Sequence, residues 1–154
     1  MADPKPYEIY AIKYAHHDRR ASENFIGGDP HDGPMPLDYF VWLIRGAGLE
    51  IVIDTGFSKA VALRRQREHI RCPAEALGLL NVDAKKIKDV VITHLHYDHV
   101  GNFDLFPAAT FHLQDREMQY ATGRHMAQPV FSGAFDVEDV VGMVRKTYAG
   151  RVCF

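Results

Sequence analysis

The chain has 154 residues, 47% of them apolar and 25% charged, and its 18 Lys and Arg against 20 Asp and Glu give a formal net charge of −2. Length and composition predict one soluble globular domain spanning residues 1–154. The charge balance excludes a nucleic-acid-binding protein, and no apolar run reaches the ~18–20 residues needed to span a membrane. Without a signal-peptide core, and with only two cysteines, the chain is expected to be cytoplasmic.

The pattern of apolar residues predicts a mixed arrangement of strands and helices. Strands are expected over residues 7–14, 38–45, 49–53, 87–93 and 109–113, with a further strand starting at 152. Helices are expected from the Ser58 cap to about 70, and over 74–80, 115–121 and 136–148. Loops are expected over 15–36 and 122–135. This order is typical of an α/β layered domain, and its stop at the start of an apolar strand predicts a fold truncated at the C-terminus.

The most informative segment is Thr93-His94-Leu95-His96-Tyr97-Asp98-His99-Val100-Gly101-Asn102, which follows the short apolar strand predicted over 87–93. Side chains two residues apart share a face of a strand, so His94 and His96 can point the same way. Asp98 and His99 can converge on them from the turn that follows. Imidazole and carboxylate groups are the ligands that zinc and similar metals prefer. The alternative is a surface loop that happens to be rich in histidine, but four ligand-type residues directly after a buried strand favour a metal site.

The spacing His94-x-His96-x-Asp98-His99 resembles the signature of the metallo-β-lactamase superfamily. The flanking residues, Asp54-Thr55-Gly56 after a strand and then ITHLHYDHVGN, resemble its N-acyl homoserine lactonase branch. The resemblance implies an αββα sandwich, of which this chain holds the first half. It also implies a zinc-dependent, quorum-quenching hydrolase that opens a lactone ring with a metal-activated water. Mn, Fe and Co are alternatives to zinc, and hydrolases of lactones, β-lactams, thioesters and phosphodiesters share the motif.

The resemblance also implies roles for individual residues. His94 and His96 would bind the first metal ion, and Asp98 and His99 the second. Asp98 would also move the proton, taking it from the water and giving it to the leaving oxygen. Asp54 would lie below the site and form a hydrogen bond to a ligand histidine or to the loop of the motif, although it can also be read as a turn former before Gly56.

The family requires a third histidine, a bridging aspartate and a last histidine after the motif. Only His112 and His125 follow His99 here, and neither is expected to be a ligand. The absent ligands are expected beyond Phe154. The alternative function is therefore a truncated metal-binding fragment without catalytic activity.

Two further residues are candidates for the substrate pocket. Tyr97 lies between ligand positions, where it can line the pocket or pack against a neighbouring helix. Phe25 lies in the polar stretch 15–36, which in lactonase-like proteins borders the substrate entrance or a dimer contact; the alternative is a solvated loop. The expected partner is a small-molecule lactone or ester, and a homodimer is left open.

Overall fold

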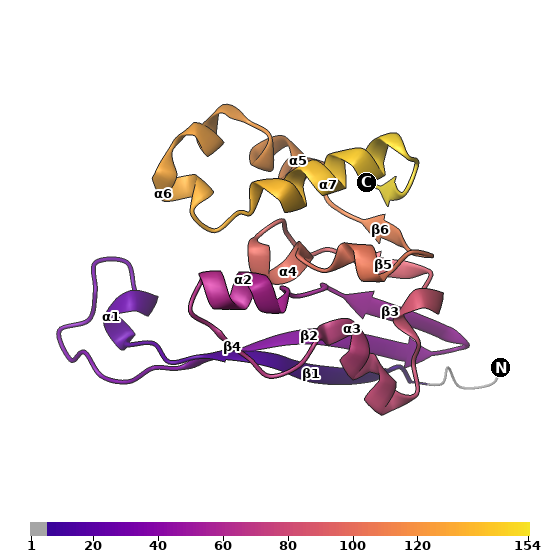
Figure 1. Cartoon of the computed structure of the whole chain (residues 1–154), viewed down its shortest axis with the longest axis horizontal. Coiled ribbons are helices and arrows are strands. Elements are labelled where there is room, and N and C mark those ends of the chain that lie inside the picture. The colour runs from indigo at the N-terminus through magenta and orange to yellow at the C-terminus, as the bar shows by residue number, and fades with distance from the viewer. Residues whose placement is uncertain (1–5) are drawn as a thin grey trace.

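The computed structural model describes residues 6–154, and within them seven strands form one mixed sheet in the order β4-β1-β2-β3-β5-β6-β7. The strands are β1 (Glu8–His17), β2 (Leu37–Gly46), β3 (Leu49–Ile53), β4 (Glu68–His69), β5 (Asp89–Val91), β6 (Thr110–His112) and β7 (Val152–Cys153). Strands β4, β1, β2 and β3 pair antiparallel, whereas β3, β5, β6 and β7 pair parallel. Figure 1 shows this order from the indigo β1 to the yellow C-terminus.

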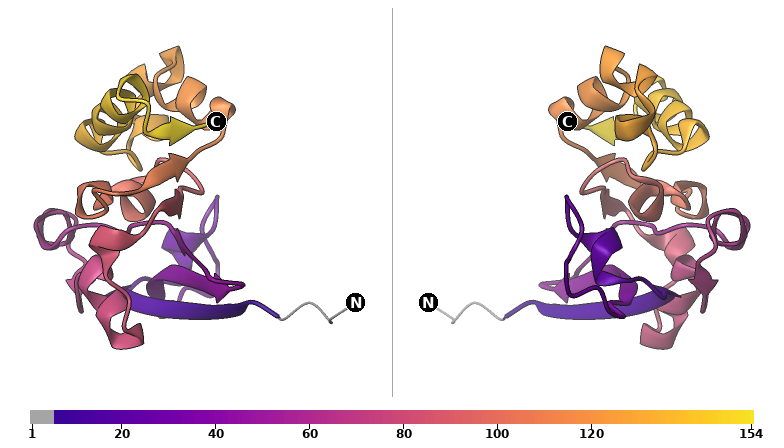
Figure 2. Two further views of the ribbon diagram at one scale, coloured as in Figure 1. Left: turned by 90° about the vertical axis from the view of Figure 1, so that its right-hand side faces the viewer. Right: turned by 90° about the vertical axis from the view of Figure 1, so that its left-hand side faces the viewer.

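The helices are short apart from the last one. They are α1 (Ala21–Asn24), α2 (Lys59–Arg64), α3 (Pro73–Ala76), α4 (Tyr97–Val100), α5 (Asp115–Ala121), α6 (Pro129–Ser132) and α7 (Val137–Tyr148), with 3-10 turns η1 (Leu77–Leu80), η2 (Ala84–Lys86), η3 (Phe103–Leu105) and η4 (Arg124–Ala127). Figure 2 shows α2, α3, α4 and α7 on the same side of the sheet. None of the helices within residues 6–154 has the length and apolar character needed to cross a membrane.

Most predicted elements are present, with three corrections. The helix expected from Ser58 to 70 ends at Arg64, because Gln66 takes a left-handed conformation with φ 57° and the chain then pairs with β1 as strand β4. The loop expected over 15–36 is shorter than predicted, because β1 continues to His17 and α1 occupies Ala21–Asn24. The loop expected over 122–135 contains η4 and α6. For β4 and for the end of β1, pairing with distant residues decides the structure, and local composition does not report it.

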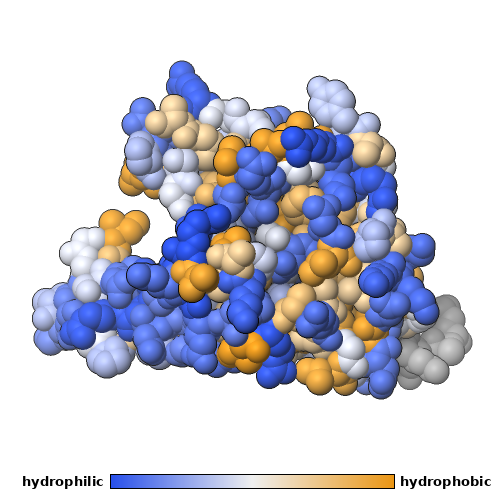
Figure 3. Space-filling view, in the orientation of Figure 1, coloured by the Kyte–Doolittle hydropathy of each residue, from blue (hydrophilic) through white to orange (hydrophobic). Residues whose placement is uncertain are grey.

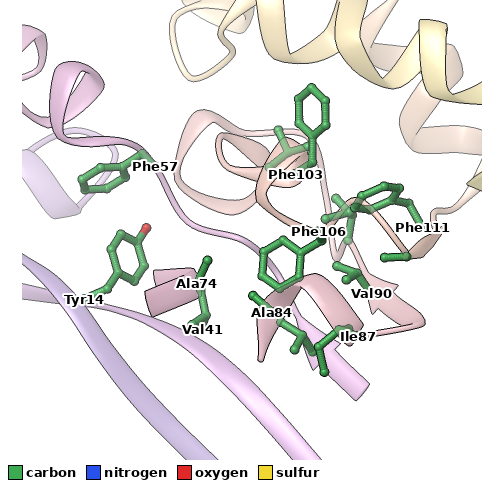
Figure 4. Close-up of a cluster of buried hydrophobic side chains, with 14 of the residues drawn as sticks. Tyr14, Val41, Phe57, Ala74, Ala84, Ile87, Val90, Phe103, Phe106 and Phe111 are labelled. Atoms are coloured by element: carbon green, nitrogen blue, oxygen red, sulfur yellow. The ribbon is translucent and has the colours of Figure 1, made fainter. Parts of the chain in front are cut away.

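The core lies between the sheet and this helical layer, as the cluster in Figure 4 shows. Tyr14 on β1 packs edge-to-face on Phe57 with ring centroids 4.9 Å apart, and both side chains are fully buried. Val41 and Leu43 of β2 and Val52 of β3 point into the same core. On the opposite face of β1 and β2, by contrast, Ile9 is 64% and Trp42 40% exposed. The described residues thus form one sheet with a helical layer on one face.

Sheet register brings the two informative sequence segments together. Strand β3 runs parallel to β5, with Ile53 opposite Val91. Asp54 directly follows β3, and the histidine-rich segment follows β5. The carboxyl ends of neighbouring parallel strands meet at one edge of a sheet, which is where α/β proteins place their ligand sites.

Candidate metal centre

The histidine motif leaves the sheet and turns into a short helix. His94 and His96 lie beyond the end of β5 rather than on its last residues, and His96 is the N-cap of α4, which contains Asp98 and His99. Leu95 and Tyr97 are buried in the core, while His94, His96, Asp98 and His99 are half-buried. The alternation of apolar and polar residues therefore turns the four candidate ligands toward the protein surface at this edge.

The structure places the four candidate ligands side by side. The ring centroid of His94 lies 4.4 Å from that of His96 and 3.8 Å from that of His99. Asp98 joins the cluster through an oxygen 3.4 Å from Nε2 of His99. Neither His112 nor His125 belongs to it: His112 pairs with Asp89 at 2.9 Å, and His125 stacks on Tyr120.

Asp54 is buried beneath the cluster and fixes one ring of it. Its carboxylate accepts hydrogen bonds from the backbone N–H of Thr93 at 2.8 Å and from Nδ1 of His99 at 2.7 Å. The Thr93 hydroxyl lies 2.8 Å and 3.0 Å from the two carboxylate oxygens. A carboxylate bound to Nδ1 fixes the tautomer and orientation of the imidazole and leaves Nε2 for another partner. Asp54 adopts φ 61°, a conformation that aspartate tolerates better than most residues.

The turn after Asp54 is bonded to the motif from a second side. The carbonyl of His99 accepts from the backbone N–H of Thr55 at 2.6 Å and from its hydroxyl at 3.1 Å. Asn102, also buried, donates its amide to the Thr55 carbonyl at 3.0 Å. The Tyr14 hydroxyl donates to the carbonyl of Asp98 at 2.7 Å. Thr55 and Tyr14 thus bond to the backbone of α4, and Asn102 ties the turn at Thr55 to the end of the motif.

Burial and charge set the protonation of the cluster. Burial lowers the pKa of His94 and of His96, which keeps both rings neutral near pH 7. Burial also opposes the charged form of His99, but hydrogen bonds to Asp54 and Asp98 outweigh it and raise the pKa of His99 to about 9. For Asp98, burial raises the pKa, but the hydrogen bond and charge of His99, together with a backbone hydrogen bond and the charge of His96, outweigh it and hold that pKa below the ordinary value.

These residues fit a metal ion by their chemistry, because neutral imidazoles and a carboxylate are zinc ligands. Their geometry is that of a partial site. Across residues 6–154 no three His, Cys, Asp or Glu side chains are arranged to hold one ion. Both ring nitrogens of His99 face carboxylates, because Nδ1 pairs with Asp54 and Nε2 pairs with Asp98.

The two candidate pocket residues lie in different surroundings. The ring of Tyr97 is buried between Phe57, stacked with centroids 5.5 Å apart, and the guanidinium of Arg65, 3.8 Å from the ring centroid. Its hydroxyl accepts from Nε of Arg67 at 3.2 Å. Phe25 is the C-cap of α1 and is 51% exposed. Helix α1 lies at the left of Figure 1, well apart from α4. The structure therefore packs Tyr97 into the core beside the ligands and does not bring Phe25 to them.

Several residues around the cluster were not identified from the sequence. Thr93 and Asn102 are the first and last residues of the quoted motif, and this position was a sequence signal that they support the site. Glu117 of α5, whose carboxylate accepts from the backbone N–H of Leu95 at 2.9 Å, carries no local signal. The same holds for Arg65 and Arg67, which lie in the helix expected from Ser58 to about 70, where charged residues are typical of a solvated face.

Comparison with known sequences shows the family of the chain. The sequence profile described as "Metallo-beta-lactamase superfamily" matches residues 35–138, which include Asp54 and the whole histidine motif. The chain is 44% identical over 108 residues to the N-acyl homoserine lactonase AttM of Azorhizobium caulinodans, covering 61% of this chain and 40% of that protein. It is 36% identical over 76 residues to the probable metallo-hydrolase YqjP of Bacillus subtilis, covering 47% and 21%. The chain thus spans less than half the length of these relatives.

Solved structures show the same fold. The hydrolase AbOPH of the β-lactamase superfamily superimposes with a TM-score of 0.69 at 15% identity, covering 99% of this chain and 58% of that one. An N-acyl homoserine lactone hydrolase, with N-hexanoyl-L-homoserine bound at its catalytic metal centre, gives a TM-score of 0.64 at 14% identity, covering 90% and 56%. Because the profile matches residues 35–138 and these neighbours share the fold, the chain belongs to the metallo-beta-lactamase superfamily and carries part of that fold.

Proposed function

We propose that this protein is a metal-dependent hydrolase that opens the ring of a small lactone, with zinc as its metal. The observation that carries the proposal is the cluster of His94, His96, Asp98 and His99 at the carboxyl edge of the parallel strands, supported from below by Asp54. The 44% identity of the chain to an N-acyl homoserine lactonase supports lactones as the substrate class. The proposal includes a quorum-quenching role, a cytoplasmic location and a monomer or homodimer.

In this proposal each residue of the cluster has a separate role. His94 and His96 would bind one ion through neutral ring nitrogens, and Asp98 and His99 would serve a second. A bound zinc ion lowers the pKa of water to ~7 and polarises a carbonyl group. Asp98, whose pKa lies below its ordinary value, would hold a proton at a carboxylate oxygen only transiently, taking it from the water and returning it to the leaving oxygen. Asp54 would keep the His99 ring in one orientation throughout.

The proposal is tested by hydrolysis of N-hexanoyl-homoserine lactone, followed by the acid that ring opening releases. The wild-type chain is assayed with added zinc and with a chelator, beside Asp98→Asn and the exposed control Asp115→Asn. We expect zinc-dependent turnover in wild type and in the control, and a loss of about a hundredfold or more in Asp98→Asn. No zinc-dependent turnover across a panel of lactones and esters would refute the proposal for this chain.

A second candidate is a metal-binding fragment without activity. It is favoured by the partial geometry of the cluster within residues 6–154 and by the share of the relatives' length that the chain spans. This candidate predicts zinc binding that depends on His94 and His96 but no turnover. Measuring zinc binding and turnover on one preparation separates the two.

A further inference from the structure

The segment joining α6 to α7 contacts the metal-binding motif through its backbone. Carbonyls of three consecutive residues, Gly133, Ala134 and Phe135, accept hydrogen bonds from two directions. The Ala134 carbonyl accepts from the backbone N–H of Tyr97 at 2.9 Å, inside the motif itself. The carbonyls of Gly133 and Phe135 accept from the guanidinium of Arg65 at 3.0 Å and 3.2 Å. The segment is therefore held between α4 and the end of α2.

Arg65 makes a second contact in the same place. Its guanidinium lies over the ring of Tyr97, 3.8 Å from the centroid, while Phe57 stacks on that ring too. One planar group thus joins the end of α2, the motif and the 133–135 segment. A guanidinium suits this role because its fork reaches two carbonyls while its flat face stacks on an aromatic ring; a lysine ammonium cannot do both.

Phe135 connects the segment held by Arg65 to His96, one of the candidate metal ligands. Its backbone forms an antiparallel bridge with His96, and its ring meets the His96 ring edge-on, at 4.8 Å between centroids and 87° between planes. The imidazole of His96 makes no side-chain hydrogen bond to residues 6–154 that would fix it as Asp54 fixes His99. Within these residues, the His96 ring is instead held by edge-on contacts with the rings of Phe135 and His94, and of these two only Phe135 comes from outside the motif.

We propose that Arg65 is a positioning residue for His96, acting through the backbone of residues 133–135 and the ring of Tyr97. The contacts of Arg65 are observed in the structure. Their effect on zinc binding rests on the proposed function, in which His96 is a zinc ligand. Arg64, next in the chain, supplies a matched comparison. Its side chain forms an ion pair with Asp136 on the same segment and makes no contact with Tyr97 among those found in the described residues.

The first test is hydrogen exchange measured by NMR on the metal-free chain, in wild type, Arg65→Met, Arg65→Lys and Arg64→Met. We expect the Tyr97 amide to exchange about tenfold faster or more in Arg65→Met, with partial recovery in Arg65→Lys. The Leu43 amide in the centre of the sheet should keep its wild-type rate, which shows that the change is local. Unchanged exchange at Tyr97 in Arg65→Met, or an equal change in Arg64→Met, would overturn the proposal.

The second test is zinc affinity measured by titration of the same four proteins. Groups that orient a metal-binding histidine typically contribute about 10- to 100-fold in affinity, so we expect a loss of that size in Arg65→Met and wild-type affinity in Arg64→Met. Equal affinities in wild type and Arg65→Met would contradict a role in positioning His96. If wild type binds no zinc, the proposed function fails, and the exchange measurement alone then decides whether Arg65 positions the segment.

Discussion

Replacing Asp54 gives the sharpest test of how the cluster is held in place. The Asp54 side chain is buried and bonded to Thr93 and to His99, so its removal leaves a backbone N–H, a hydroxyl and a ring N–H without their acceptor. Breaking a buried charged pair by removing one partner costs about 3–5 kcal/mol, and we expect a loss of that size in Asp54→Ala. Asp54→Asn retains a neutral acceptor and should lose about 1–2 kcal/mol.

The backbone conformation of Asp54 adds a control that contacts alone would not predict. At φ 61°, alanine is strained whereas glycine is not, so Asp54→Gly should be about 1 kcal/mol more stable than Asp54→Ala. The measurement is urea and thermal unfolding in chelator, followed by circular dichroism, with exposed Asp115→Ala as the control. For a domain of this size the Asp54→Ala loss corresponds to a Tm lower by roughly 6–20 °C. An Asp54→Ala protein within about 1 kcal/mol of wild type would refute the reasoning.

Three other substitutions test the packing and electrostatics around the site. Gly142→Ala places a methyl group against the buried ring of Phe103 and should destabilise the chain by about 1–3 kcal/mol in urea unfolding; no change would show that the ring can move aside. Tyr14→Phe removes the hydroxyl that donates to the Asp98 carbonyl and should cost about 1–3 kcal/mol, whereas a stability equal to wild type would mean that water replaces it. Burial, with a neighbouring carboxylate, raises the pKa of Asp139 from 3.8 to about 7. The unfolded chain therefore binds fewer protons than the folded one between those values, and stability falls as pH rises from about 4 to 7. Asp139→Asn should raise Tm more at pH 8 than at pH 5, and an equal shift at both would contradict this.

Local pattern was enough to predict the elements on which the site depends. The hairpin of β2 and β3 follows from two β-branched runs around Gly46-Ala47-Gly48, and its tight turn uses positive φ at Ala47 and Gly48. The spacing of the motif predicted that His94, His96, Asp98 and His99 would lie together, and they do. What the pattern misplaced was the backbone beneath them, since Asp98 and His99 lie on helix α4 and not in a turn.

The supporting residues could not be predicted because their partners are distant in the chain. Arg65 contacts Gly133 and Phe135, about seventy positions later, and its own neighbours resemble an ordinary charged helix. Likewise Glu117 meets Leu95 only because α5 packs beside the motif. Asp54 was an exception, since its place after a strand and before Thr55-Gly56 fitted the family resemblance.

Zinc content per chain is the measurement that tests the central claim most directly. It is determined by elemental analysis on size-fractionated protein, in wild type and in the double variant His94→Ala/His96→Ala. The account predicts zinc that copurifies with the wild-type chain or is acquired on titration, and that is lost in the double variant while the fold is retained. Equal zinc content in the two proteins, or none in wild type after titration, would contradict the assignment of this cluster as the metal site.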